Sequence, residues 1–137
     1  MTNVMSSLGC TQVMYCGFRS LLEPGDEVVL LEPAFDIYAS QVILCGGTPK
    51  FVSLTTDLTV PEKTANEVFK LDFDALEAAV NEKTKVLVLN TPHNPTGKMF
   101  TSEEQERIGE SLYRLSTAYT PPTNPPLTLT PSTFTRR

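Results

Sequence analysis

The stretch that most constrains the fold of this chain is an apolar run, Val86 to Leu89, that leads directly into a polar loop ending at Lys98. Branched apolar residues bounded by turn formers are typical of a strand that is buried on both faces of a parallel sheet. The loop lies at the carboxyl end of this predicted strand, which is the edge where open α/β sheets bind ligands. An ordinary turn explains the segment 94–97 equally well, because Asn, Pro and Gly are common turn residues.

Helical and extended patterns alternate along the first 114 residues. Apolar residues spaced by three and four predict helices, and short apolar runs between turn signals predict strands. The predicted helices cover residues 10–22, 34–45, 72–80 and 101–114, and the predicted strands cover 27–31, 48–54 and 86–89. This alternation is typical of right-handed crossover units. We therefore predict the α/β class, as a partial three-layer α/β/α sandwich with a mostly parallel sheet, and a polar surface excursion over residues 55–70.

Two of the predicted helices have clear start signals. Asp72 precedes the apolar stripe of one helix and is a typical N-cap residue. Thr101 followed by Glu104 is a capping-box pattern, which predicts a helix that runs to about Arg114.

The pattern changes abruptly after the last predicted helix. From Ser116 to Arg137 the chain has seven Thr, five Pro, two Ser and no acidic residue. Such a segment cannot bury enough apolar surface to offset the cost of ordering it. We therefore divide the chain into one domain, residues 1–114, and a disordered Thr/Pro-rich tail, residues 115–137, which we interpret as an aberrant or truncated reading frame. An O-modified stalk or a Pro-rich recognition segment is the alternative.

Charge and cysteine usage exclude several classes of partner. The net charge of −5 and the absence of a Lys/Arg cluster argue against nucleic acid. Cys10, Cys16 and Cys45 are scattered and odd in number, so we expect buried thiols in a reducing compartment and no metal site. No run approaches the length of a membrane span, and no secretion signal is recognisable. We expect a cytoplasmic location, with a mitochondrial one as the alternative.

Two further segments offer ligand contacts. Gly9-Cys10-Thr11 opens the first predicted helix, where free N–H groups and the helix dipole attract an anion. The same pattern is also a common helix cap. Phe35 follows the strand 27–31, at the sheet edge that also holds Asn94, so its ring is placed to stack on a planar ligand. The alternative is that Phe35 belongs, with Tyr38, to the buried face of its own helix.

Taken together, these segments resemble the N-terminal part of the large domain of class I pyridoxal-phosphate aminotransferases. The closest branch is that of the kynurenine aminotransferases, also called cysteine-S-conjugate β-lyases. The matching motifs are, in order, Gly9-Cys10-Thr11, Glu23-Pro24-Gly25-Asp26-Glu27-Val28, Glu32-Pro33-Ala34-Phe35-Asp36-Ile37-Tyr38 and Asn90-Thr91-Pro92-His93-Asn94-Pro95-Thr96-Gly97-Lys98. The resemblance covers roughly residues 3 to 110, and the last motif is highly specific when it follows the other three.

The resemblance implies pyridoxal 5′-phosphate as the cofactor and assigns its contacts. The turn Gly9-Cys10-Thr11 is expected to bind the phosphate through backbone N–H groups. The ring of Phe35 is expected to stack on the pyridine ring, and Asn94 to donate its amide to the phenolic oxygen. An amide always keeps a donor for that oxygen, whereas a carboxylate would repel it. The intact family is a homodimer that moves an amino group from a kynurenine-like, aromatic or glutamine-like amino acid to a 2-oxo acid.

The resemblance also implies residues that this chain lacks. The family has an Asp about thirty residues after the position of Asn94, then a Tyr, the Schiff-base Lys and an Arg for the substrate carboxylate. Pro121 and Pro122 stand at the spacing of that Asp. Lys98 is not the Schiff-base lysine, and we expect it to be solvated or to lead into the next helix.

No catalytic residue is therefore assigned, and we expect the polypeptide alone to be inactive. A non-catalytic truncated product, or a binding partner of a full-length aminotransferase, is the alternative. A dinucleotide-binding domain is disfavoured because no G-x-G-x-x-G motif follows a predicted strand.

Overall fold

The chain folds around one parallel sheet. The computed structural model describes residues 6–57, 59, 64–119 and 127–129. The sheet contains β1 (Glu27–Glu32), β2 (Thr48–Ser53), β5 (Thr84–Val88) and β6 (Leu127–Leu129). Their order is β2-β1-β5-β6, and every pairing is parallel. The predicted α/β class and parallel sheet are confirmed.

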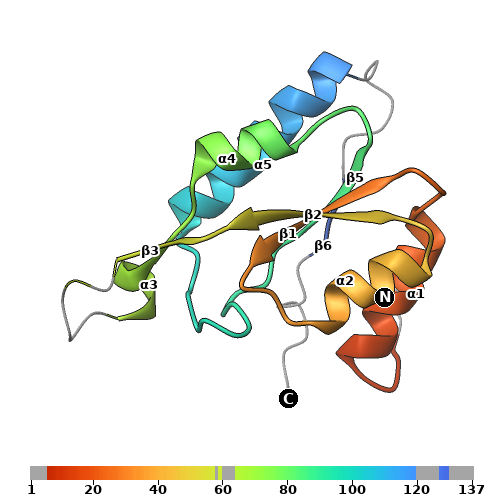
Figure 1. The fold of residues 1–137 in the computed structure, drawn as a ribbon, viewed down its shortest axis with the longest axis horizontal. Coiled ribbons are helices and arrows are strands. Elements are labelled where there is room, and N and C mark those ends of the chain that lie inside the picture. Colours follow the sequence, from red (N-terminus) through yellow and green to blue (C-terminus); the bar gives the residue numbers. More distant parts are fainter. Residues whose placement is uncertain (1–5, 58, 60–63, 120–126, 130–137) are drawn as a thin grey trace.

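Helices cover both faces of this sheet (Figure 1). On one side lie α1 (Cys10–Leu21) and α2 (Ile37–Leu44), and on the other lie α4 (Phe73–Ala79) and α5 (Ser102–Tyr119). Two separate clusters of buried apolar side chains fill the spaces between sheet and helices, one on each face. The three-layer α/β/α arrangement is therefore confirmed.

The central strand β1 shows why its sequence is continuously apolar. Val28 and Leu30 belong to the cluster under α1 and α2, whereas Val29 and Leu31 belong to the cluster under α4 and α5. Successive side chains of a strand point to opposite faces, so a strand covered on both sides needs apolar residues at every position. The neighbouring strand β5 alternates in the same way, and this explains the apolar run that begins at Val86.

The predicted starts of the helices at Asp72 and Thr101 are confirmed, whereas one other helix begins later than predicted. Asp72 Oδ1 accepts hydrogen bonds from the N–H groups of Asp74 and Ala75, both at 3.0 Å. Thr101 and Glu104 form the capping box: the Thr101 N–H donates to Glu104 at 2.9 Å, and the Glu104 N–H donates to the Thr101 hydroxyl at 3.2 Å. The helix predicted from residue 34 instead begins at Ile37, because residues 33–36 form the connection after β1.

The segment 55–70 contains regular structure that the sequence reading missed. β3 (Thr55–Thr56) pairs antiparallel with β4 (Phe69–Lys70), and a single helical turn, α3 (Ala65–Val68), precedes β4. A capping box between Thr64 and Glu67 starts this turn. The pattern T-x-x-E was therefore a usable signal in a stretch dominated by polar residues.

The tail also differs from its prediction. α5 continues to Tyr119, beyond the expected end near residue 114, and Leu127–Leu129 form β6 beside β5. Residues 115–119 and 127–129 therefore have regular structure within the range that the sequence predicts to be a disordered tail. The alternation of Leu127, Thr128 and Leu129 is a short strand pattern that the Thr/Pro composition obscured. The remaining tail residues lie outside the described ranges.

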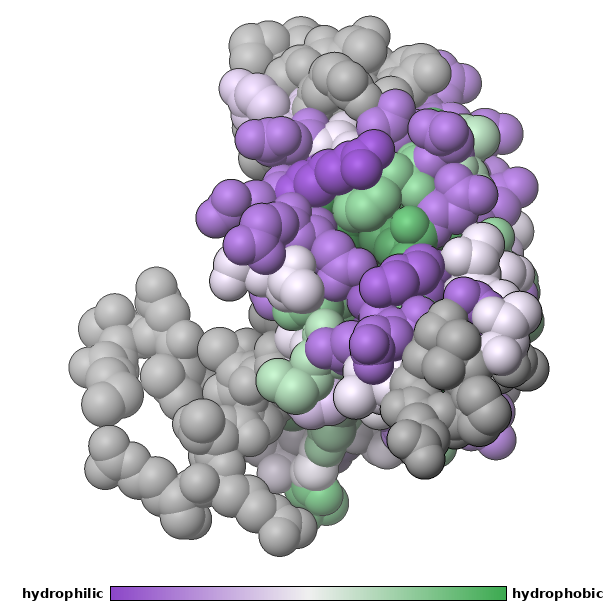
Figure 2. All heavy atoms as spheres, turned by 90° about the vertical axis from the view of Figure 1, so that its left-hand side faces the viewer, coloured by the Kyte–Doolittle hydropathy of each residue, from purple (hydrophilic) through white to green (hydrophobic). Residues whose placement is uncertain are grey.

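The surface is mostly polar, with some large apolar side chains exposed. Figure 2 shows a largely hydrophilic face with a compact hydrophobic area surrounded by hydrophilic residues. Among the large apolar side chains, Ile43 and Leu44 of α2 and Phe51 of β2 are 62%, 73% and 47% exposed. None of the helices in the described ranges is long and apolar enough to cross a membrane.

Candidate functional site

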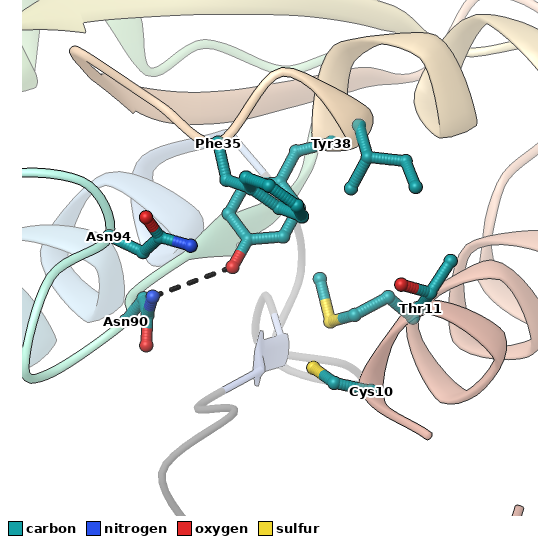
Figure 3. Close-up of a pocket in the computed structure, with 8 residues that line it drawn as sticks. Cys10, Thr11, Phe35, Tyr38, Asn90 and Asn94 are labelled. Carbon is teal, nitrogen blue, oxygen red and sulfur yellow. Dashed lines mark hydrogen bonds between the residues drawn. The ribbon is translucent and has the colours of Figure 1, made fainter. Parts of the chain in front are cut away.

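An open cavity of about 260 Å³ lies beside the connections that follow β1 and β5 (Figure 3). This volume is slightly below the roughly 300–1,000 Å³ of most small-molecule sites. Its lining residues come from α1, from the connection between β1 and α2, from the start of α2 and from the loop after β5. They are Cys10, Thr11, Met14, Phe35, Ile37, Tyr38, Asn90 and Asn94. Four of the five predicted site residues therefore meet at one place, although they are separated by up to 84 positions in the chain (94 − 10).

The fifth predicted residue, Gly9, lies next to the cavity as the N-cap of α1. Its φ of 138° is a backbone conformation that side chains disfavour, so glycine suits this position. No side-chain hydrogen bond caps the helix. The first intrahelical bond runs from the Val13 N–H to the Gly9 carbonyl at 3.2 Å. The N–H groups of residues 10–12 therefore have no partner within the helix and make a typical anion site.

Phe35 presents an accessible ring between β1 and α2. It is 39% exposed, whereas Tyr38, three residues later, is only 7% exposed. The two rings meet edge to face, with centroids 5.7 Å apart and an interplanar angle of 81°. The alternative that Phe35 belongs to the buried helical face is therefore wrong, and one side of its ring is available to a planar ligand.

Polar side chains gather around the hydroxyl of Tyr38. The Asn90 amide donates to this hydroxyl at 3.5 Å, and in Figure 3 the Asn94 amide also points toward the tyrosine. Burial raises the pKa of Tyr38, and repulsion from the charge that Cys10 carries when ionised raises it further. The phenol therefore stays protonated at neutral pH, and its O–H remains a donor on the cavity wall.

Tyr38 and Asn90 are not among the site residues predicted from the sequence. The helical spacing predicts that Tyr38 lies on a buried helical face, and Tyr38 is indeed buried while also lining the cavity. Asn90 is the first polar residue after the apolar run of β5, and that position was a usable signal.

The loop that holds Asn94 is closed by its own hydrogen bonds. The His93 N–H donates to the Lys98 carbonyl, and the Gly97 N–H donates to the His93 carbonyl, both at 2.7 Å. Gly97 has a φ of 74°, which permits this tight return of the chain. The His93 ring Nδ1 lies 2.8 Å from the Thr96 hydroxyl. These bonds fix the backbone on both sides of Asn94.

Lys98 is buried, so the prediction that it is solvated is wrong. Its side chain is 2% exposed, and α5 begins only at Ser102. The ammonium group contacts both carboxylate oxygens of Glu104, at 2.9 and 3.1 Å, and lies 5.0 Å from the centre of the Phe100 ring. Lys98 therefore ties the end of the Asn94 loop to the first turn of α5, and it does not line the cavity.

The prediction that the cysteine thiols are buried is wrong for two of the three. Only Cys45 is buried, whereas Cys10 and Cys16 are exposed. Cys10 is exposed because it occupies the first turn of α1 at the cavity. Within the part of the chain that the structure describes, no group of three or more His, Cys, Asp and Glu residues is arranged to hold a metal ion.

The donor set suits a small aromatic phosphate. Free N–H groups at the start of α1 match a phosphate, the open side of Phe35 matches a planar ring, and the Asn94 amide matches a ring oxygen. None of the lining residues that the structure describes is acidic, so these side chains place no carboxylate against an anion.

Comparison with known proteins identifies the family. The profile of the family "Aminotransferase class I and II" matches residues 1–117, and the chain belongs to this family. Members of the family generally use pyridoxal phosphate.

The chain is similar to kynurenine–oxoglutarate transaminases. It is 36% identical to the one from Dictyostelium discoideum over 115 residues, which is 80% of this chain and 26% of that protein. It is 38% identical to kynurenine–oxoglutarate transaminase 1 from Rattus norvegicus, with 79% and 26% of the two chains covered. The chain thus spans about a quarter of the length of these relatives.

Solved structures show the same likeness. The crystal structure of Bna3p from Saccharomyces cerevisiae superposes with a TM-score of 0.74 and 36% identity, covering 79% of this chain and 26% of that one. N-succinyldiaminopimelate aminotransferase from Mycobacterium tuberculosis gives a TM-score of 0.69 and 35% identity, with 80% and 27% covered. The proteins that are similar to this chain therefore include aminotransferases named for different substrates, kynurenine and N-succinyldiaminopimelate.

Proposed function

We propose that this chain is the cofactor-binding part of a pyridoxal-phosphate-dependent aminotransferase of the kynurenine type. The observation that supports this best is the convergence of Cys10, Thr11, Phe35 and Asn94 on one cavity. The first turn of α1 binds the phosphate, Phe35 covers one face of the ring, and Asn94 donates to the ring oxygen. When bound, the cofactor supplies an electron sink for amino-acid chemistry. The substrates of the whole enzyme are a kynurenine-like or other amino acid and a 2-oxo acid.

Binding of the cofactor can be tested directly on the full chain. Titration with pyridoxal phosphate, followed by absorbance, should show saturable binding that is weaker for pyridoxal, which has no phosphate. Phe35→Leu should weaken binding because it removes the stacking surface. The matched control is Phe51→Leu, since Phe51 is also partly exposed but lies on β2, outside the cavity. Equal affinity for pyridoxal and pyridoxal phosphate would contradict the proposal.

We also propose that this polypeptide does not catalyse transamination by itself. Among the described residues that line the cavity there is no lysine, and the Lys98 ammonium is bound by Glu104. Without a lysine, nothing in the cavity can form the covalent bond through which the family holds its cofactor and relays a proton. A transaminase assay with added pyridoxal phosphate should therefore give no turnover, and turnover that depends on the cofactor would refute this.

A non-catalytic role as a partner of a full-length aminotransferase is the second candidate. The exposed apolar side chains of Ile43 and Leu44 on α2 favour it, because unpaired apolar residues on a helix are common in contact surfaces. Co-purification of the tagged chain with an intact aminotransferase would support this role. Replacing both residues by Ser should abolish that co-purification, and unchanged recovery would contradict the role.

A further inference from the structure

The cavity end of α1 is attached to α2 by side chains of α2. Gln41 Nε2 donates to the carbonyl oxygen of Thr11 at 2.8 Å, and the Cys45 thiol lies 3.9 Å from the carbonyl oxygen of Tyr15. On each helix the two positions are four residues apart, so both contacts lie on facing sides of the helix pair. The contact of Gln41 is the one nearer the cavity, because Thr11 lines it.

Gln41 places a polar side chain at a buried position, where it destabilises the fold. It is 4% exposed, and its Oε1 is the one buried side-chain oxygen or nitrogen in the described part of the chain without a hydrogen-bond partner. A buried polar atom without a partner destabilises the fold, whereas an apolar side chain of similar size would fill the same space without this penalty. Packing alone therefore does not account for a glutamine here, and the distinguishing contribution of the side chain is its bond to Thr11.

The first turn of α1 has few other attachments. The buried residues of the helix are Met14 and Phe18, which lie further along, while residues 10–12 are all exposed. A helical carbonyl uses one lone pair within the helix and has a second available for a lateral donor. The bond from Gln41 therefore holds the backbone of the turn whose N–H groups face the cavity.

We propose that Gln41 is a positioning residue for the anion-binding turn of α1. It fixes the Thr11 carbonyl against α2, and this orients the N–H groups of residues 10–12 toward a phosphate in the cavity. Ile37 and Tyr38 of the same helix line the cavity, so the bond also sets the phosphate-binding turn in register with the wall opposite it. The link to phosphate rests on the function proposed above, whereas the ordering of the turn does not.

Hydrogen exchange on the ligand-free full chain tests the ordering. In Gln41→Met, amide exchange at residues 13–15 should accelerate about threefold to tenfold relative to residues 17–20, because the first turn loses a lateral bond. The melting temperature should stay equal or rise, since methionine removes the unpaired Oε1. Cys45→Ala is the matched control on the same helix pair, and it should not accelerate residues 13–15 selectively. Unchanged exchange in Gln41→Met, or uniform acceleration along α1, would overturn the proposal.

Affinity measurements test the link to phosphate. Pyridoxal phosphate should bind Gln41→Met about fivefold more weakly than the unmodified chain, while binding of pyridoxal should be unchanged. Gln41→Glu should also bind pyridoxal phosphate more weakly than the unmodified chain does, because a carboxylate cannot donate to the Thr11 carbonyl. Equal affinity for pyridoxal phosphate in both chains would overturn the role of Gln41. Failure of the unmodified chain to bind pyridoxal phosphate would refute the proposed function instead, and the exchange experiment would still decide the ordering of the turn.

Discussion

Replacing Lys98 by Met should destabilise the fold more than any replacement of a surface lysine. The change keeps most of the aliphatic stem and removes the ammonium group that contacts Glu104 at 2.9 and 3.1 Å. Because the Lys98 side chain is 2% exposed and that of Glu104 is 20% exposed, the carboxylate loses its partner in a place that water reaches only partly.

The magnitude follows from this partial burial. Removing one partner of a fully buried ion pair costs about 3–5 kcal/mol. Here Glu104 keeps its hydrogen bond from the Thr101 N–H and some contact with water. We therefore expect a loss of about 2–3 kcal/mol in the free energy of unfolding, in line with hydrogen bonds to charged groups.

Urea unfolding followed by far-ultraviolet circular dichroism measures this loss. With an ordinary urea dependence for a small domain, the midpoint should fall by about 1 M. Lys50→Met is the matched control, because the Lys50 side chain is 44% exposed and lies 3.4 Å from Glu27. The Glu27 side chain is only 12% exposed, but its carboxylate keeps a hydrogen bond from the Asn81 amide at 2.7 Å after Lys50 is replaced. That control should lose less than about 1 kcal/mol.

The double variant Lys98→Met with Glu104→Gln distinguishes the ion pair from packing. If the pair is responsible, the second change should add little to the first, because the carboxylate that was left without a partner is now neutral. A Lys98→Met variant as stable as Lys50→Met would refute the reasoning, and so would strictly additive losses in the double variant.

Three further outcomes are expected. Burial lowers the pKa of His93, opposed by a hydrogen bond to the Leu31 backbone and assisted by the charge of Lys98. The unfolded chain therefore binds a proton at His93 more readily than the folded chain does. The contribution of His93 to stability should be fully present above about pH 6.5 and should fall as the pH drops below it. In His93→Gln, the melting temperature should depend less on pH between about pH 7.5 and 5.5. Gly109→Ala should raise the unfolding free energy by about 0.5–1 kcal/mol, because a Cβ there meets nothing within 4 Å. Gly47→Ala should instead lower it by about 1–3 kcal/mol, because a Cβ there would lie 3.0 Å from the Leu22 side chain. Chemical denaturation that gives both changes the same sign would contradict this. Asp72→Ala should cost about 1 kcal/mol by leaving two N–H groups at the start of α4 without their acceptor, while Asp72→Asn should cost less in the same experiment.

The elements that the sequence predicted well are those whose local signals agree with their packing. β1 and β5 contain continuous apolar runs because both faces are covered, and the caps at Asp72 and Thr101 act within three residues. The convergence of the candidate site residues on one cavity could be predicted for a similar reason. Cys10, Phe35 and Asn94 stand at ends of regular elements, where the topology of a parallel sheet brings them together.

The parts that failed depend on contacts between distant residues. Lys98 looked solvated because lysines usually are, and only the packing of α5 places Glu104 beside it. Tyr38 looked like an ordinary core residue because helical spacing cannot show that one edge of a buried ring faces a cavity. β6 depends on pairing with β5, about forty residues earlier, and composition gives no indication of such a partner.

The order β2-β1-β5 also determines when each edge of β1 acquires a neighbouring strand as the chain is synthesised. β1 acquires its first neighbour once Ser53 has emerged, but its other edge stays open until residues 84–88 follow. During this interval the backbone groups of Val28 to Leu30 that later pair with β5 are accessible to any other extended chain. A nascent chain should therefore be most vulnerable to mispairing over that interval of roughly thirty residues, and a chaperone that binds extended apolar segments should leave it only after β5 has docked.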